Sequence, residues 1–244
     1  MSTITPKQRS ILEREAKVLE LARHMVLTGG YHGLGLERLA AELKVSRGTI
    51  YNHFACKEEI IIALLIETMD KRRAMFERAA ASRDLPRIRL AAIGVAAELF
   101  VRLYPDHFRV EQIVKSDSIW NKTTEERRSV VKSCQVKCVG IVAQIVRDGV
   151  SSRHVTLNDG QSPEALVFGL WSMTEGAHSI LATSDSMEAL GIGEPFVAIR
   201  HNIHRMLDGY GWSPLSIDHD YNAEMEQIAN DVFPAEFAQL SQAW

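Results

Sequence analysis

The apolar residues of this chain recur every three or four positions along most of its length, which is the period of an α-helix. In residues 123–148, for example, the apolar stripe runs through Val131, Cys134, Cys138 and Ile145. No convincing alternation of apolar and polar residues, the pattern of a half-buried strand, interrupts this period, and no internal repeat is visible. The pattern therefore predicts an all-α protein.

The same periodicity gives the expected bounds of the individual helices. Helices are expected at residues 10–27, 36–43, 47–53, 57–80, 86–103, 105–116, 123–148, 163–184 and 194–210. Residues 213–244 are expected to form one or two weak helices broken at Pro234. The segments 151–163 and 184–195 read as loops, and Trp120 falls in a further loop.

The composition is that of a globular protein with a real core. The 244 residues are 46% hydrophobic and 24% charged. No apolar run approaches the roughly 20 residues that span a membrane, and the N-terminal residues contain no apolar signal core. With three cysteines and no secretion signal, we expect a cytoplasmic protein with free thiols.

Charge is distributed unevenly along the chain. Residues 1–78 contain 13 Lys+Arg and 10 Asp+Glu, whereas residues 213–244 contain six acids and no Lys or Arg. A basic N-terminal part beside an acidic remainder suggests a polyanionic partner for the first part, although so small an excess is weak evidence alone.

The stretch "SRGTIYNHFACKEE", residues 46–59, carries the chemistry of a DNA-binding element. Two short helices joined by the turn "KVS" and braced by a preceding helix make a helix-turn-helix, whose second helix enters the DNA major groove. Ser46 is placed to cap that second helix, while Val45, Ile50 and Phe54 form its inner face. Lys57 begins the next helix, where its ammonium and the free N–H groups can meet a phosphate.

The outer face of the second helix pairs hydrogen-bonding groups four residues apart. These pairs are Arg47 with Tyr51, Gly48 with Asn52, and Thr49 with His53. The glycine lets the backbone approach DNA closely. A plain helical corner with polar residues facing solvent is the alternative interpretation.

Over residues 11–60 the sequence resembles the TetR family of bacterial transcriptional regulators. The family pattern is a glycine-aromatic turn, a short helix ending in a Val-Ser turn, and then Leu/Ile-Tyr-x-His/Tyr-Phe-x-x-Lys-Glu. The matching residues are Gly30, Tyr31, Leu39, Ala40, Val45, Ser46, Ile50, Tyr51, His53, Phe54, Lys57 and Glu58. The resemblance implies that Arg47, Thr49 and Asn52 contact base edges or phosphates. It implies that Tyr51, His53 and Lys57 mainly hold phosphates, which set register more than sequence.

The sequence departs from the family pattern in two places. Leu34 and Gly35 stand where the family usually places Ser or Thr before the second helix, so this chain lacks the hydroxyl that caps the helix and touches phosphate in the family. Glu37 follows where a neutral or basic side chain suits DNA better. Beyond residue 80, only the helical character and the approximate length resemble the family.

We expect the chain to have three parts and to form a dimer. Residues 1–55 are the expected DNA-binding bundle of three helices, residues 56–210 the helical ligand-binding and dimerisation domain, and residues 211–244 an acidic extension. A homodimer is expected through residues 163–184 and 194–210, where Gly169 and Gly176 let two helices approach. The expected partners are a palindromic double-stranded operator and a small-molecule effector that releases it.

Aromatic and soft side chains of the second part suggest the wall of an effector pocket, although they equally suit a plain core. The candidates are Phe100, Leu103, Tyr104, Phe108, Cys138, Trp171 and Met173, with Glu175 or His178 as a polar anchor. They favour an apolar or aromatic ligand with few polar groups. A regulator controlled by a protein partner, through the acidic extension, is the alternative.

An enzyme is the least favoured class. The sequence contains no P-loop, HExxH or GxSxG motif and no complete set of metal ligands, so no catalytic residue, metal or cofactor is expected. Cys134 and Cys138 lie four apart but lack a third ligand. Cys56, at a helix N-terminus, is either a redox-sensitive thiol or an inert small residue, and the second interpretation is favoured.

Overall fold

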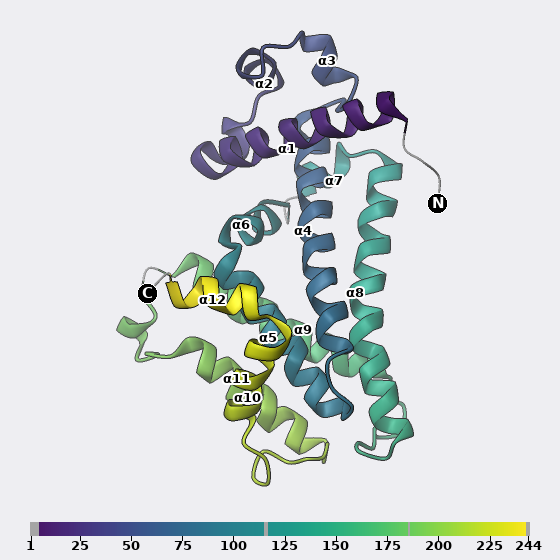
Figure 1. The fold of residues 1–244 in the computed structure, drawn as a ribbon, viewed down its shortest axis with the longest axis vertical. Helices are drawn as coiled ribbons and strands as arrows, with labels where there is room; N and C mark the ends of the chain where they lie inside the picture. Colours follow the sequence, from purple (N-terminus) through teal and green to yellow (C-terminus); the bar gives the residue numbers. More distant parts are fainter. Residues whose placement is uncertain (1–4, 115–116, 185, 243–244) are drawn as a thin grey trace. The chain divides into compact units, whose positions relative to one another are not determined.

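A computed structural model of the chain describes residues 5–114, 117–184 and 186–242. These residues form helices and connecting segments without a strand, which confirms the all-α prediction (Figure 1). The α-helices are α1 (Pro6–Gly33), α2 (Leu36–Glu42), α3 (Arg47–Tyr51), α4 (Lys57–Ala80), α5 (Pro86–Leu103), α6 (Pro105–Val114), α7 (Asp117–Asn121), α8 (Glu125–Ser151), α9 (Pro163–Thr183), α10 (Pro195–Gly209), α11 (Tyr221–Val232) and α12 (Pro234–Gln242).

Local sequence signals account for most helix bounds. Thr5 forms a capping box with Gln8 at the start of α1, and Gly30, with φ of 62°, kinks that helix close to the predicted stop. Ser162 caps α9, and Pro163 occupies its first position. Pro234 does not merely break the C-terminal segment: it begins α12. The short α7 was predicted as a loop.

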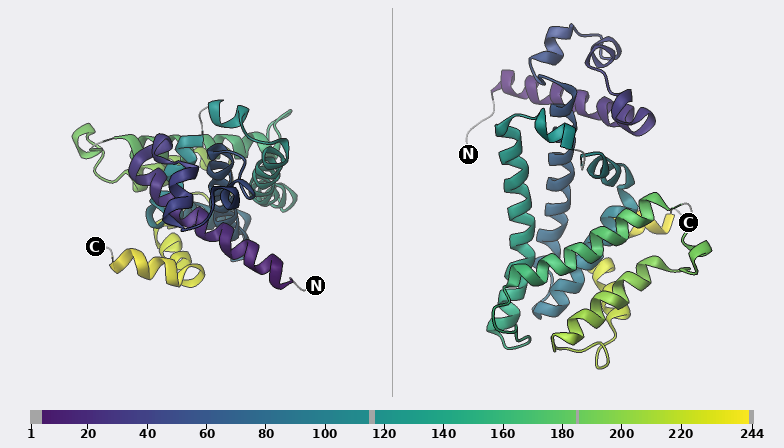
Figure 2. Two further views of the ribbon diagram at one scale, coloured as in Figure 1. Left: turned by 90° about the horizontal axis from the view of Figure 1, so that it is seen from above. Right: turned by 180° about the vertical axis from the view of Figure 1, so that it is seen from behind.

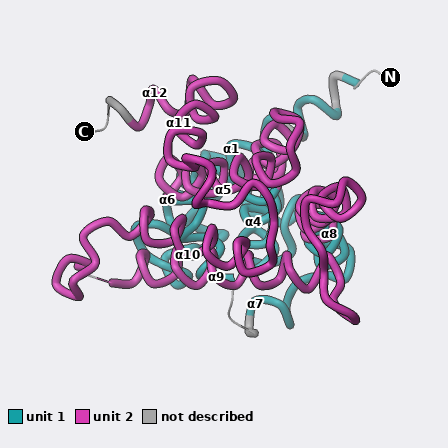
Figure 3. The backbone as a smooth tube through the Cα atoms, turned by 90° about the horizontal axis from the view of Figure 1, so that it is seen from below, with its two compact units in different colours: residues 1–69, 106–134 teal, residues 70–105, 135–244 magenta. Residues whose placement is uncertain are grey.

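The chain forms two compact units, which Figure 3 shows in different colours. Unit 1 comprises residues 1–69 and 106–134, and unit 2 comprises residues 70–105 and 135–244. Two of the boundaries between the units lie inside long helices, α4 and α8. Each of these helices therefore contributes residues to both units.

Unit 1 packs α1 to α3 around the apolar start of α4. Its core contains Val18, Leu39, Ile50 and Phe54 together with the run Ile60–Leu65. Because Ile50 and Phe54 are fully buried, the opposite face of α3 is turned to solvent. The core therefore fixes which side chains of the helix-turn-helix are exposed.

Unit 2 includes the C-terminal extension as part of its core. Helices α11 and α12, the most yellow segments in Figure 2, pack on α5, and Met225, Ile228 and Phe233 are buried there. The acids of the extension face arginines: Glu224 and Asp231 pair with Arg83, at 3.4 and 2.9 Å. Glu236 pairs with Arg78 at 2.5 Å. The extension is thus a structural part of this unit.

Helix α8 is the described helix whose length and composition would suit a membrane span, with a mean hydropathy of 1.3 over its most apolar window. Its apolar residues serve the two cores instead. Val131 and Cys134 are buried in unit 1, while Ile145 and Val146 are buried in unit 2. Burial in two protein cores is the simpler account of its composition.

Candidate DNA-binding surface and regulatory core

The start of α3 is fixed by its serine cap. Ser46 accepts a hydrogen bond from the backbone N–H of Thr49 at 3.1 Å, and the two hydroxyl oxygens lie 2.8 Å apart. The turn before it places Lys44 in the left-handed region, with φ of 54°, and the N–H of Val45 donates to Ala40 O. This turn sets the angle at which α3 leaves α2.

The structure turns the predicted contact face of α3 outward. Tyr51 is 47% exposed, and Ser46, Arg47, Gly48 and Asn52 are also exposed, whereas Thr49, His53 and Lys57 are half-buried. These side chains form one outward polar surface on unit 1, which we call the α3 surface: Ser46, Arg47, Gly48, Thr49, Tyr51, Asn52, His53 and Lys57. A surface of donors above a buried apolar face suits groove and phosphate contacts.

Among the described residues, no neighbour requires a glycine at position 48. A Cβ added there would meet only Ser46 Oγ, at an ordinary 3.7 Å. Glycine in the middle of an exposed helix lowers helix stability. The residue is therefore better explained by something that approaches α3 from outside.

The departures from the family pattern are visible at α2. Gly35 is the N-cap of this helix and supplies no side-chain hydrogen bond. Glu37 lies in its first turn, and its carboxylate is 3.9 Å from the guanidinium of Arg47. Both side chains are exposed, so the pair is weak and leaves Arg47 free to rearrange.

Two buried acids at the start of α4 were not predicted as site residues. Glu58 is 3% and Glu59 4% exposed. Glu59 accepts a hydrogen bond from the backbone N–H of Thr124 at 2.7 Å and pairs with Arg127. Acids in the first turn of a helix usually face solvent, so only the packing of α8 against α4 within unit 1 reveals this role.

Cys56 has the surroundings of an inert thiol. Its pKa is raised by burial and, further, by Glu58, although backbone N–H groups of the helix start oppose this. A thiolate is the reactive form, so a raised pKa disfavours a redox role. Cys134 belongs to unit 1 and Cys138 to unit 2, and no group of three or more potential ligands among the described residues is placed to hold a metal.

The predicted effector-pocket residues do not all lie in the same unit. Phe108 belongs to unit 1, and the other eight belong to unit 2. Of these eight, Phe100 and His178 are buried and Trp171 is exposed; Leu103, Tyr104, Cys138, Met173 and Glu175 are half-buried. The rings of Phe100 and Tyr104 lie 5.6 Å apart.

The prediction that Trp171 faces inward was wrong for the single chain, because 48% of its surface is exposed. Leu166, Val167 and Leu170 are buried against unit 2. Successive residues are rotated by about 100° around a helix, so Trp171 lies to one side of the buried residue Leu170. Phe168, 65% exposed, lies on the same outer side.

His178 is the buried titratable group of this region. The centroid of its ring lies 6.0 Å from that of Phe196. The guanidinium carbon of Arg102 lies over the Phe196 ring, 5.3 Å from its centroid. Burial, aided by Arg72, lowers the pKa of His178 to about 4. Glu98 lies between Arg102 and Arg200, at 2.9 and 2.5 Å. The region is therefore more polar than its sequence indicated.

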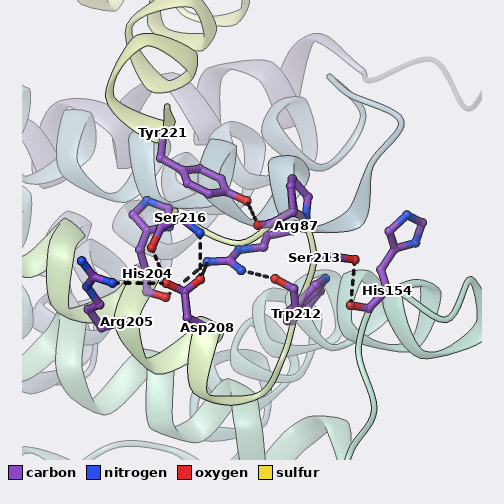
Figure 4. A network of polar contacts seen from close by, with 10 residues as sticks. Arg87, His154, His204, Arg205, Asp208, Trp212, Ser213, Ser216 and Tyr221 are labelled. Atoms are coloured by element: carbon purple, nitrogen blue, oxygen red, sulfur yellow. Dashed lines mark hydrogen bonds and ion pairs between the residues drawn. The ribbon is translucent and has the colours of Figure 1, made fainter. Parts of the chain in front are cut away.

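A second polar network ties the extension to α10 (Figure 4). The fully buried Arg87 pairs with Asp208 at 2.6 Å and donates to the carbonyls of His204 and Trp212. Asp208 also accepts from the N–H of Ser216 at 3.0 Å. The ring of His204 stacks on that of Tyr221, with 4.1 Å between centroids.

A pocket of about 540 Å³ opens beside this network. It is lined by His201, His204, Arg205, Ser216, Ile217, Asp218, His219, Asp220, Tyr221 and Asn222. None of the predicted effector-pocket residues is among them. Its polar lining differs from the apolar pocket that the sequence suggested.

Residues 18–64, which contain the whole helix-turn-helix, match the family described as bacterial regulatory proteins, tetR family. The chain therefore carries the DNA-binding domain of the TetR family. It is 25% identical over 158 residues to the HTH-type transcriptional repressor AcnR of Corynebacterium jeikeium, covering 59% of this chain and 82% of AcnR. It is 22% identical over 179 residues to the fatty acid metabolism regulator protein of Bacillus subtilis, covering 70% and 90%. This TetR-family protein is therefore a DNA-binding transcriptional regulator and not an enzyme, as the motifs predicted.

Solved structures of other transcriptional regulators share the fold. FadR from Bacillus subtilis, solved with stearoyl-CoA, superposes with a TM-score of 0.60 at 17% identity, covering 79% of this chain and 96% of FadR. A transcriptional regulator from Saccharomonospora viridis, solved with choline, has a TM-score of 0.60 at 21% identity, covering 80% and 96%. These similarities extend the likeness beyond the helix-turn-helix to the helices of the second part.

Proposed function

We propose that this TetR-family regulator is a cytoplasmic repressor that binds a palindromic operator as a homodimer. The observation that carries the proposal is the α3 surface, because its polar side chains face outward above the buried Ile50 and Phe54. Arg47 and Asn52 have the fork and amide geometries that read guanine and adenine edges. Tyr51, His53 and Lys57 hold phosphates. The similarity to a repressor, AcnR, favours repression over activation.

The dimer forms through α9 and α10. Phe168 and Trp171, three residues apart on one side of α9, expose large apolar surfaces, and a Cβ on Gly176 would meet no atom of the described residues within 4 Å. Neighbouring exposed apolar residues mark an association surface. A two-fold dimer places its two α3 helices about 34 Å apart, which is one turn of DNA.

A small molecule acts as the effector within unit 2 and releases the operator by favouring a conformation with a different spacing. The fatty-acid regulator and the choline-bound regulator among its relatives are solved with small ligands. The neighbouring rings of Phe100 and Tyr104 suit an apolar or aromatic body, and the buried His178 of the same unit offers a polar group. Control by a protein partner through the acidic extension is less favoured, because three of its six acids pair with Arg78 and Arg83.

Selection of duplexes from a random-sequence pool tests the operator. The bound duplexes should share a palindrome with half-sites one turn apart, whereas enrichment of a single half-site would argue against the dimer.

Sedimentation should show a species near twice 27.3 kDa. Trp171→Asp should shift it toward the monomer, while Ile217→Asp, at an 83% exposed position outside α9, should not.

A screen of small apolar and aromatic compounds tests the effector. A true effector raises the melting temperature and lowers affinity for the selected operator, and His178→Gln reduces both responses. If no compound shifts either quantity, control by a protein partner becomes the better account.

A further inference from the structure

Tyr31 holds the ammonium of Lys57 in place. Its Nζ lies 3.8 Å from the centroid of the Tyr31 ring and donates to Tyr31 O at 3.4 Å. An ammonium has three N–H donors. One is directed at the carbonyl, and the others remain for an oxygen arriving from outside. The kink at Gly30, one residue earlier, brings Tyr31 to this position.

Tyr31 is held in turn by the buried carboxylate of Glu58. The Tyr31 hydroxyl donates to Glu58 Oε1, and the ammonium of Lys122 lies 3.1 Å from the same oxygen. Burial alone would raise the pKa of Glu58, but the hydrogen bonds from Tyr31, from the backbone and from Lys122 lower it to about 2. The carboxylate therefore stays charged, and Lys122 offsets a charge that would otherwise repel a phosphate.

We propose that Tyr31 and Glu58 are positioning residues for the Lys57 phosphate contact, and that Lys122 completes the set. The inference rests on the proposed DNA contact of the α3 surface. Free lysine side chains lose much rotamer freedom when they bind a phosphate. The ring and carbonyl of Tyr31 restrict Lys57 before DNA arrives, so less freedom is lost on binding.

Two substitutions at Tyr31 separate the ring from the hydroxyl. Tyr31→Phe keeps the ring under Lys57 but removes the hydrogen bond to Glu58, and Tyr31→Leu removes both. Affinity for a short duplex of arbitrary sequence is the readout, because phosphate contacts bind any sequence. Tyr31→Leu should weaken this binding about tenfold. Tyr31→Phe should weaken it less, which makes the variants a graded series.

A double-mutant cycle with Lys57→Ala decides whether Tyr31 acts through Lys57. On the Lys57→Ala background, Tyr31→Leu and Glu58→Gln should have no further effect on DNA affinity. Additive losses would overturn the inference, because they would indicate a general structural role. Circular dichroism checks the fold, and Tyr31→Phe keeps the cycle interpretable if Tyr31→Leu unfolds.

The cycle also distinguishes failure of this inference from failure of the proposed function. Lys57→Ala alone should lower the slope of log affinity against log salt by about one. If Lys57→Ala changes neither affinity nor slope, the phosphate contact itself is wrong. If Lys57→Ala weakens binding while the Tyr31 variants bind like the wild type, only the positioning role is wrong.

Discussion

The guanidinium of Arg127, at the start of α8, lies 5.0 Å from the centroid of the Phe54 ring, at the end of the α3 turn. The same guanidinium pairs with the buried Glu59 of α4. One arginine thus joins the recognition element to a buried acid within unit 1. Breaking such a pair leaves a charge buried without its partner.

Arg127→Ala should therefore lower the free energy of unfolding by about 3 kcal/mol. Arg38 pairs with Glu42 at 2.9 Å on α2 and both side chains are exposed, so Arg38→Ala is the control for loss of a surface ion pair. The control should cost less than about 0.5 kcal/mol. Urea titrations of both variants check this, and equal midpoints would show that the Arg127 pair stabilises nothing.

Gly48→Ala separates the needs of the protein from those of DNA. Because the new Cβ meets only an ordinary contact, the variant should be as stable as the wild type or up to about 1 kcal/mol more stable. Its affinity for the selected operator should fall, since the methyl group occupies the space of the approaching DNA. Thermal melts and binding titrations give the two quantities, and unchanged affinity would remove DNA as the reason for this glycine.

The buried histidines predict acid sensitivity. Burial, aided by Arg72 and Arg87 respectively, lowers the pKa of His178 and of His204 from 6.5 to about 4. Between pH 6.5 and 4 the unfolded chain binds more protons than the folded chain. Stability should be fully present above pH 6.5, fall by about 1.4 kcal/mol per pH unit for each histidine, and level off below pH 4.

Denaturant titrations across this pH range check the slope. His178→Asn and His204→Asn should each reduce it, and both together should reduce it further. His201→Asn, at an exposed position of α10, is the matched control for the substitution itself. A wild-type slope in the double variant would show that other groups cause the acid sensitivity.

The C-terminal extension should behave as part of a core. Phe233 is fully buried, so Phe233→Ala should cost about 3 to 5 kcal/mol of unfolding free energy. Ile217→Ala, in the same extension but 83% exposed, should cost almost nothing. Two similarly mild effects would mean that the extension is only loosely attached.

Sequence periodicity was sufficient to locate the long helices, and the predicted bounds of α4 and α5 agree with the structure. The outward direction of Arg47 and Tyr51 also followed from the spacing of Ile50 and Phe54. Tertiary contacts account for the failures. Glu58 and Glu59 look like ordinary first-turn acids until Lys122 and Arg127 are placed beside them, because those partners lie more than sixty residues away.

Tertiary contacts also decide whether the Trp171 side chain faces the core of its own chain or solvent. In a nearly apolar helix such as α9, periodicity does not separate the face that packs on its own chain from a face left for a partner. The structural role of the C-terminal extension could not be predicted from the sequence for another reason. Its acids suggested solvent or a partner, and only the arginines of α4 and the following loop explain them.

The central claim is that the α3 surface reads DNA sequence, and the affinity ratio between the selected operator and an unrelated duplex tests it most directly. Arg47→Ala should lower this ratio tenfold or more, corresponding to about 1 to 3 kcal/mol of lost discrimination, while binding to the unrelated duplex changes less. An unchanged ratio in both Arg47→Ala and Asn52→Ala would contradict the account.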